Sequence, residues 1–234
     1  MPRRYYYLLT SLPTLPALGD APPIGLSDLG QMARAEAAAG DVVDALLLDY
    51  DLLLREAALA GEIEAPRPAV LTAEQMGEQA PLPDFLQAEP AHRLRIPADA
   101  VWEAYYRHAD RLGRRRHCRF LVEWVAAEVA LRNALVDARA EMLQLDGEPY
   151  RVAADLAAAD EPVGAAARAF TEAPDPLTGL RRLDEARWRW VEQRDAYYSF
   201  GIDELAAYAR KLVLLTRWHV LSGQPAGGTA DRGG

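Results

Sequence analysis

RRHCRFLVEWVAAEVALRNALVDARAEMLQL, residues 115–145, carries the clearest secondary-structure signal in the sequence. Apolar residues recur three or four positions apart in two stripes: Phe120, Trp124, Ala127, Leu131, Leu135, Ala138 and Met142 form the first, and Leu121, Val125, Val129, Val136 and Leu143 form the second. This spacing is the period of an α-helix, and a helix that is apolar on two sides usually lies at the centre of a bundle. Glu128 and Arg132 have the spacing of an i,i+4 ion pair.

Segments with the same periodicity lie on both sides of this stretch. Ser27 is a good N-cap for a helix that runs through Ala39 and ends at Gly40. Asp41 is expected to cap a second helix to about Ala60. Further helices are expected at about 98–112, as two short Ala-rich pieces within 149–175, at 180–198 and at 202–221. No strand-like alternation persists, so the sequence predicts an all-α multi-helix bundle.

Proline residues separate the helical parts of the chain. Residues 62–97 are interrupted by Pro66, Pro68, Pro81, Pro83, Pro90 and Pro97. We therefore interpret 62–97 as an irregular connection between an N-terminal helical lobe, 1–61, and a C-terminal helical lobe, 98–221. Thr72 and Gln75 are placed to cap one helical turn within the connection. Residues 222–234 are Gly-rich and polar, which predicts a disordered tail.

Composition excludes several classes of protein. The net charge is -9, and a nucleic-acid binder needs a basic face, so we expect no nucleic-acid partner. No stretch approaches the ~20 apolar residues of a membrane span. The single cysteine, Cys118, allows no intrachain disulfide, which fits a reducing compartment and predicts a cytoplasmic protein.

Catalytic and cofactor motifs are missing from the sequence. The sole lysine, Lys211, lies inside the last expected helix, so no phosphate-binding loop with a Gly-Lys-Ser/Thr element exists. The four histidines do not have the spacing of a helical metal site. Cys118 lies among arginines, and it is either a reactive thiol or a small buried apolar residue. We predict no catalytic, cofactor or metal site, and no enzyme.

Two clusters are candidates for partner binding. The first is the arginine collar, which we define as Arg111, Arg114, Arg115, Arg116 and Arg119. Positive charge at a helix N-terminus opposes the helix dipole, so the collar either binds an acidic partner or is a solvated helix end. The second is the pair Trp188 and Trp190, which point to different faces of a helix. One is expected in the core, and the other is either covered by an arginine stem or is an interface anchor.

Four stretches together resemble a known family. They are YYYLLTSLP at 5–13, LDYDLL at 48–53, the long-helix residues Phe120, Glu123, Trp124 and LRNAL at 131–135, and FGID at 200–203 followed by Ala207, Tyr208, Lys211, Leu212, Arg217 and Trp218. The chain resembles an uncharacterised family encoded among bacterial V-type ATPase genes. That family is similar to the C-type socket protein of the archaeal-type ATPase, whose eukaryotic counterpart is the d-type protein.

The resemblance implies a non-catalytic helical socket or adaptor between the central stalk and the membrane rotor ring of a V/A-type ATPase. The expected partners are other subunits of the complex, and the expected location is cytoplasmic, peripheral to the inner membrane. The C-type socket protein has three similar lobes and this chain looks too short for them, so an assembly factor and a partial replacement for the socket both stay open. The alternative is a helical enzyme or small-ligand binder whose site assembles from scattered residues.

Overall fold

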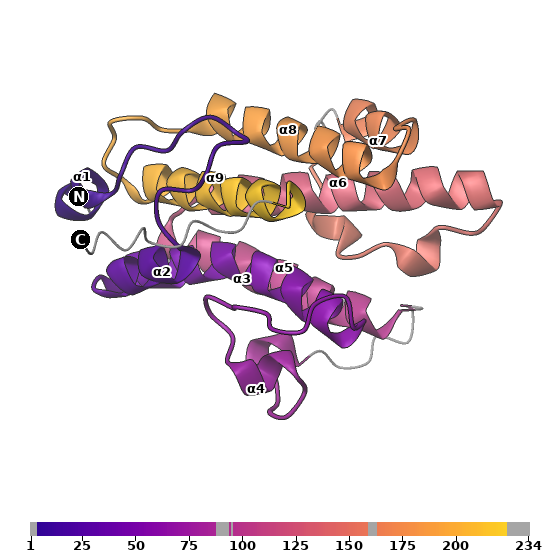
Figure 1. Ribbon diagram of the computed structural model, residues 1–234, viewed down its shortest axis with the longest axis horizontal. Helices are drawn as coiled ribbons and strands as arrows, with labels where there is room; N and C mark the ends of the chain where they lie inside the picture. The colour runs from indigo at the N-terminus through magenta and orange to yellow at the C-terminus, as the bar shows by residue number, and fades with distance from the viewer. Residues whose placement is uncertain (1–3, 88–93, 95, 159–162, 224–234) are drawn as a thin grey trace, which may run out of the picture.

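The computed structural model describes residues 4–87, 94, 96–158 and 163–223, and these residues contain no β-strand (Figure 1). The helices, in chain order, are α1 (Tyr6–Ser11), α2 (Leu26–Arg34), α3 (Ala37–Leu59), α4 (Ala73–Met76), α5 (Pro97–Arg116), α6 (Arg119–Leu143), α7 (Val163–Thr171), α8 (Pro176–Arg194) and α9 (Ile202–Leu221). Single 3-10 turns lie at Asp84–Leu86, Glu148–Tyr150 and Ala154–Leu156. The prediction of an all-α multi-helix bundle is confirmed.

The boundary expected at Gly40 is wrong, because Gly40 lies inside α3. The chain instead turns between Arg34 and Ala37, where α2 ends and α3 begins. A Cβ atom added to Gly40 would lie 3.0 Å from Cα of Arg34. Gly40 therefore permits the close approach of two helices rather than ending one of them.

The long central helix begins later than expected. His117 takes a left-handed conformation, with φ of 53°, and ends α5, so α6 begins at Arg119. At this turn a Cβ atom on Gly113 would lie 2.8 Å from Cγ2 of Val122, which shows how tightly α5 packs on α6. The sequence predicts two Ala-rich helices within 149–175. The described residues of this range contain α7 and two 3-10 turns instead.

One hydrophobic core joins the N-terminal and C-terminal parts of the chain. It contains Val42 and Leu46 of α3 together with Trp124 of α6 and Leu212 of α9. Helix α3 packs against both α9 and α5, so the two segments that we interpreted as lobes share this core. The C-terminal part of α6 projects beyond the end of α9 in Figure 1, and the stripe residue Met142 is exposed there.

The proline-rich connection is held to the core by one buried carboxylate. Asp51, in α3, accepts hydrogen bonds from the backbone amides of Ala69, Val70 and Leu71 at 2.9, 2.7 and 2.9 Å. Burial raises the pKa of Asp51, and the three amides partly offset this effect. The expected capping box of Thr72 and Gln75 is present at the start of α4.

None of the helices in the described part of the chain combines the length and the apolar character needed to cross a bilayer.

We expect Trp124→Ala to lower the free energy of unfolding by about 3–5 kcal/mol, because the substitution leaves a large cavity in the core. The Trp124 side chain is only 2% exposed. Chemical denaturation followed by circular dichroism measures the change. Met142→Ala, in the exposed part of the same helix, is the control and should change stability by less than about 0.5 kcal/mol. Equal effects of the two substitutions would contradict this assignment of the core.

Candidate functional site

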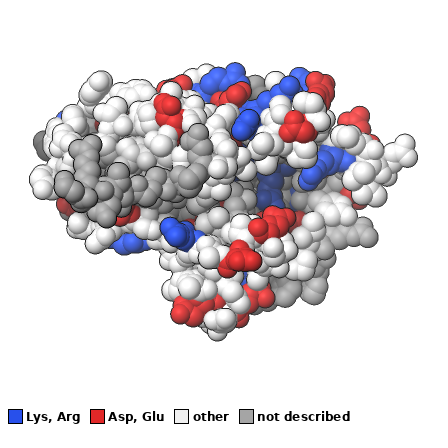
Figure 2. All heavy atoms as spheres, viewed as in Figure 1, with Lys and Arg blue, Asp and Glu red and all other residues white. Residues whose placement is uncertain are grey.

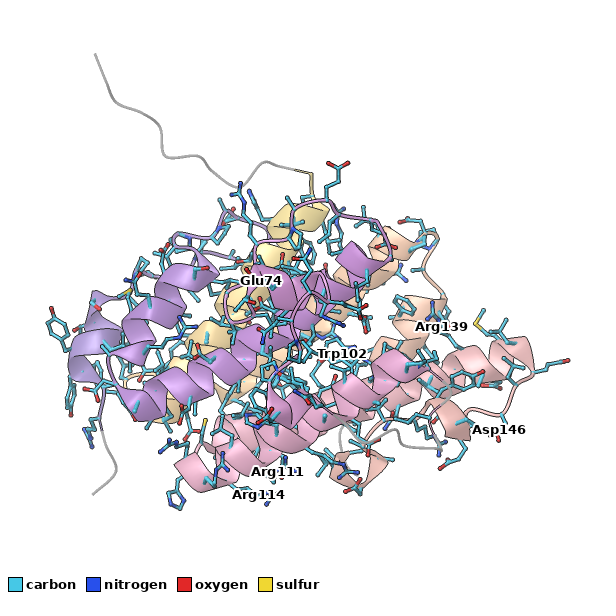
Figure 3. The ribbon with its side chains drawn as sticks, turned by 90° about the horizontal axis from the view of Figure 1, so that it is seen from below. Glu74, Trp102, Arg111, Arg114, Arg139 and Asp146 are labelled. Atoms are coloured by element: carbon cyan, nitrogen blue, oxygen red, sulfur yellow. The ribbon has the colours of Figure 1, made fainter. Side chains whose placement is uncertain are left out.

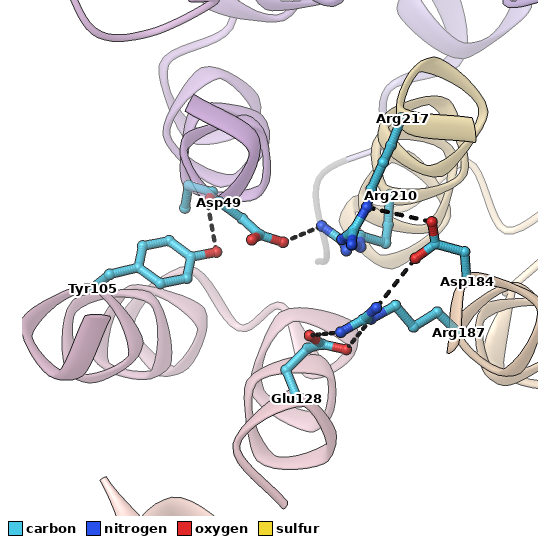
Figure 4. A network of polar contacts seen from close by, with 8 residues as sticks. Asp49, Tyr105, Glu128, Asp184, Arg187, Arg210 and Arg217 are labelled. Carbon is cyan, nitrogen blue, oxygen red and sulfur yellow. Dashed lines mark hydrogen bonds and ion pairs between the residues drawn. The ribbon is translucent and has the colours of Figure 1, made fainter. Parts of the chain in front are cut away.

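Buried charges connect four helices at the centre of the molecule (Figure 4). The Arg187 guanidinium, from α8, donates two hydrogen bonds to the Glu128 carboxylate of α6, at 2.7 and 3.0 Å. A third bond, of 3.1 Å, joins Arg187 to Asp184 on the preceding turn of α8. Burial alone would raise the pKa of Glu128, but the facing Arg187 guanidinium outweighs burial and lowers this pKa.

The second half of this network lies between α3 and α9. Arg210 of α9 forms a buried ion pair with Asp49 of α3, and its guanidinium stacks 4.1 Å from the centroid of the Trp124 ring. Tyr105 of α5 donates a hydrogen bond of 3.0 Å to the Ala45 carbonyl. Each of the carboxylates Glu128, Asp184 and Asp49 is engaged by an arginine within the core. The arrangement is suited to holding helices together.

The arginine collar is exposed at the turn between α5 and α6. Arg114 pairs with Asp110 at 2.8 Å, Arg116 pairs with Asp41 of α3, and Arg119 pairs with Glu123. Figure 3 shows Arg111 and Arg114 close together on α5, far from Arg139 and Asp146 at the other end of the α5–α6 pair. The expected position of the collar at a helix N-terminus is wrong for Arg114, Arg115 and Arg116, because they lie in the last turn of α5, where the helix dipole favours positive charge. The collar is an accessible surface that is partly neutralised by neighbouring carboxylates, and its binding of a partner stays a prediction.

The structure places both candidate tryptophans against the core. Trp190 is buried, edge-on to the rings of Phe120 and Trp124, with centroid distances of 5.6 and 5.3 Å. The Arg194 guanidinium covers the Trp190 ring at 4.2 Å. Trp188 is half-buried, with the ammonium group of Lys211 at 5.7 Å from its ring. Trp190 therefore does not present its ring to a partner.

The two edges of one face of the molecule differ in their charged side chains. Figure 2 shows acidic side chains around α4, at the lower edge of the view, and basic side chains interspersed with acidic ones along the upper edge, where α8 lies. The sequence has the same asymmetry, because residues 1–100 hold 15 acidic and 7 basic residues, whereas residues 101–234 hold 20 acidic and 19 basic residues. An uneven distribution of charge orients a partner and speeds its encounter with the protein.

The sequence patterns did not predict the most exposed aromatic surface of the described residues. It is the tyrosine cluster, which we define as Tyr6, Tyr7, Tyr197 and Tyr198. Tyr7 is 90% exposed and Tyr198 is 84% exposed, and the other two rings are about half exposed. The cluster joins α1 to the α8–α9 connection, and both lie at the same end of the molecule in Figure 1.

Hydrogen bonds fix the two segments to each other. The Tyr5 amide donates to the Phe200 carbonyl at 2.7 Å, and the rings of Tyr6 and Phe200 lie 4.7 Å apart. On the other side of the cluster, the ammonium group of Lys211 donates to the Tyr197 hydroxyl at 2.6 Å and to the Asp195 carboxylate at 2.9 Å. The rings are therefore presented by an ordered backbone.

The backbone under the cluster is strained. Tyr198 and Phe200 have φ angles of 62° and 52°, in the left-handed region that costs a non-glycine residue about 1–2 kcal/mol. The Glu204 carboxylate holds this conformation by accepting hydrogen bonds from the Phe200 amide at 2.6 Å and the Ser199 hydroxyl at 3.3 Å. Such strain persists where surrounding contacts enforce it, and it occurs preferentially at binding sites.

Comparison with known proteins gives no relative, since no family model, curated protein or solved structure matches the chain. Among the described residues, no group of three or more His, Cys, Asp and Glu side chains is arranged to hold a metal ion.

We expect Cys118 to be unreactive in the folded protein. Its side chain is fully buried, and burial raises the pKa of the thiol, so the thiolate fraction at about pH 8 is lower in the folded than in the unfolded state. Labelling by a disulfide reagent should be slower by on the order of 100-fold in buffer than in denaturant. Equal labelling rates would show that the thiol is accessible.

Proposed function

We propose that the protein is a non-catalytic adaptor that docks onto other subunits of a bacterial V/A-type ATPase, between the central stalk and the membrane rotor ring. The tyrosine cluster carries this proposal and is its docking surface. The proposal takes the identity of the complex from the family resemblance and the place of docking from the geometry of the cluster.

The composition and rigidity of the tyrosine cluster favour binding to a protein. Tyrosine combines a large apolar ring with a hydroxyl, and it is enriched among the residues that contribute most to protein–protein binding. The contacts of Phe200 and Lys211 already order the backbone, so little conformational entropy is lost when a partner binds. A surface with these properties is suited to binding another protein rather than to catalysis.

Two of the four stretches that resemble the ATPase-associated family meet at this end of the molecule. Residues 5–13 supply Tyr6 and Tyr7, and the FGID stretch at 200–203 supplies the backbone that pairs with Tyr5. The Tyr208 hydroxyl donates a hydrogen bond of 2.8 Å to the Pro13 carbonyl and fixes the first stretch over α9. The resemblance therefore falls on residues that build the tyrosine cluster.

The buried charges support a role without catalysis. Glu128, Asp184 and Asp49 are each engaged by an arginine within the core. The exposed arginine collar supplies a second surface of different character, and two unlike surfaces suit a protein held between two neighbours.

The double substitution Tyr7→Ser and Tyr198→Ser tests the docking surface. A tagged copy in the native host should recover at least about tenfold less ATPase from the membrane fraction, because exposed aromatic anchors contribute about 1–2 kcal/mol or more each. The matched control is Leu59→Ser with Val220→Ser, which removes exposed apolar side chains elsewhere and should leave recovery unchanged. Circular dichroism verifies that both variants fold.

Undiminished recovery with the tyrosine variant would exclude the cluster as the docking surface. A wild-type protein that never recovers ATPase subunits would refute the proposed complex itself.

A further inference from the structure

An open groove extends from the central charge network to the projecting part of α6. Its volume is about 600 Å³, and side chains of α3, α5, α6, α7, α8 and α9 line it. Sites for small molecules typically have volumes of ~300–1,000 Å³. Figure 3 shows Trp102 and Arg139, which both line the groove, well separated from Arg114 of the arginine collar.

The outer walls of the groove are apolar. Leu135, Val136 and Leu143 line it from α6, and Phe170 and Leu180 line it from α7 and α8. Leu143 is 66% exposed, so this apolar wall is in contact with solvent. Burial of such a wall by a ligand is favourable by roughly 25 cal/mol per Å² of apolar surface removed from water.

The floor of the groove is charged, and its arginines differ in how well they are neutralised. Arg132 donates a hydrogen bond of 2.7 Å to Asp99, and Arg187 is bound by Glu128 and Asp184. Both guanidinium groups therefore already have carboxylate partners. Burial lowers the pKa of both arginines, but Tyr106 and Asp99 outweigh it at Arg132, and Glu128 and Asp184 outweigh it at Arg187, so both pKa values are raised.

Arg217 is the exception on this floor. Its Nε atom lies 3.3 Å from an oxygen of Asp184, but its guanidinium donates no hydrogen bond to any residue that the structure describes. Burial lowers the pKa of Arg217, Asp184 only partly offsets this, and the positive charge of Arg187 lowers it further. The side chain is 16% exposed and lines the groove, so its donors can be reached from there.

We infer that the groove binds an amphipathic carboxylate, with the hydrocarbon chain against the apolar walls and the carboxylate on the guanidinium of Arg217. A planar guanidinium matches a carboxylate through two parallel hydrogen bonds. Arg217 has an ion pair with Asp184 through Nε, and a bound carboxylate supplies the hydrogen-bond acceptor that its guanidinium lacks among the described residues. A small anion would leave the apolar walls exposed to water. An amphipathic cation would place its positive charge next to the positive charge of Arg217, which is unfavourable. The inference goes beyond the proposed function and uses residues that are not part of the tyrosine cluster.

Isothermal titration calorimetry with three probes tests the ligand class. Decanoate carries both features, acetate carries the charge alone, and decyltrimethylammonium carries the chain with the opposite charge. We expect decanoate to bind at least about tenfold more tightly than either of the other two. Acetate binding as tight as that of decanoate would overturn the proposal, and so would equal binding of the cation.

Three variants test the location. Arg217→Gln removes the charge at the floor, and Leu143→Gln changes a wall residue whose side chain is 66% exposed. Each should weaken decanoate binding, the first by about tenfold or more. Arg189→Gln, at an exposed arginine of α8 outside the groove, should bind decanoate like the wild type.

Unchanged affinity in Leu143→Gln would overturn the proposal even if Arg217→Gln fails to fold. Equal loss of affinity in Arg189→Gln would show that decanoate responds only to surface charge, and would overturn it as well.

Discussion

A set of buried charges that must stay paired determines how α3, α6, α8 and α9 meet. An unpaired charge in a protein interior costs several kcal/mol, so each carboxylate of the set must face its arginine in the folded state. The bidentate pair of hydrogen bonds between Arg187 and Glu128 is directional, unlike apolar packing. It therefore fixes how α8 is rotated about its axis and how far it is shifted along that axis relative to α6. The pair of Arg210 and Asp49 does the same for α9 on α3.

Helix α9 connects this centre to both surfaces of the molecule. Arg210, at its middle, is held by Asp49 and by the ring of Trp124. Toward the start of the helix, Glu204 supports the strained backbone of the tyrosine cluster, and near the end Arg217 reaches the floor of the groove. One ion pair in the core therefore positions a proposed docking surface and a proposed ligand site at opposite ends of one rigid element.

Helical periodicity was sufficient to predict the fold class and the burial of Trp124 and Leu131, because both depend on local spacing. The charge partners were not predictable in this way. The spacing of Glu128 and Arg132 indicated an i,i+4 pair, yet Glu128 binds Arg187, 59 positions away, and Arg132 binds Asp99. The tyrosine cluster was missed for the same reason, since its two tyrosine runs meet only through the tertiary fold; the runs themselves were the available signal.

A double-mutant cycle on Glu128→Gln and Arg187→Gln tests the central role of the buried charges most directly. Each single substitution should destabilise the fold by about 3–5 kcal/mol, because it removes one charge of a buried, doubly hydrogen-bonded pair. Glu128→Gln leaves Arg187 with Asp184 as its remaining partner, so its effect should be the smaller of the two. The double variant should be more stable than the sum of the single effects predicts, with a coupling energy of about 2 kcal/mol or more measured by chemical denaturation. Single effects that add to within about 0.5 kcal/mol would contradict the account, since the two side chains would then act independently.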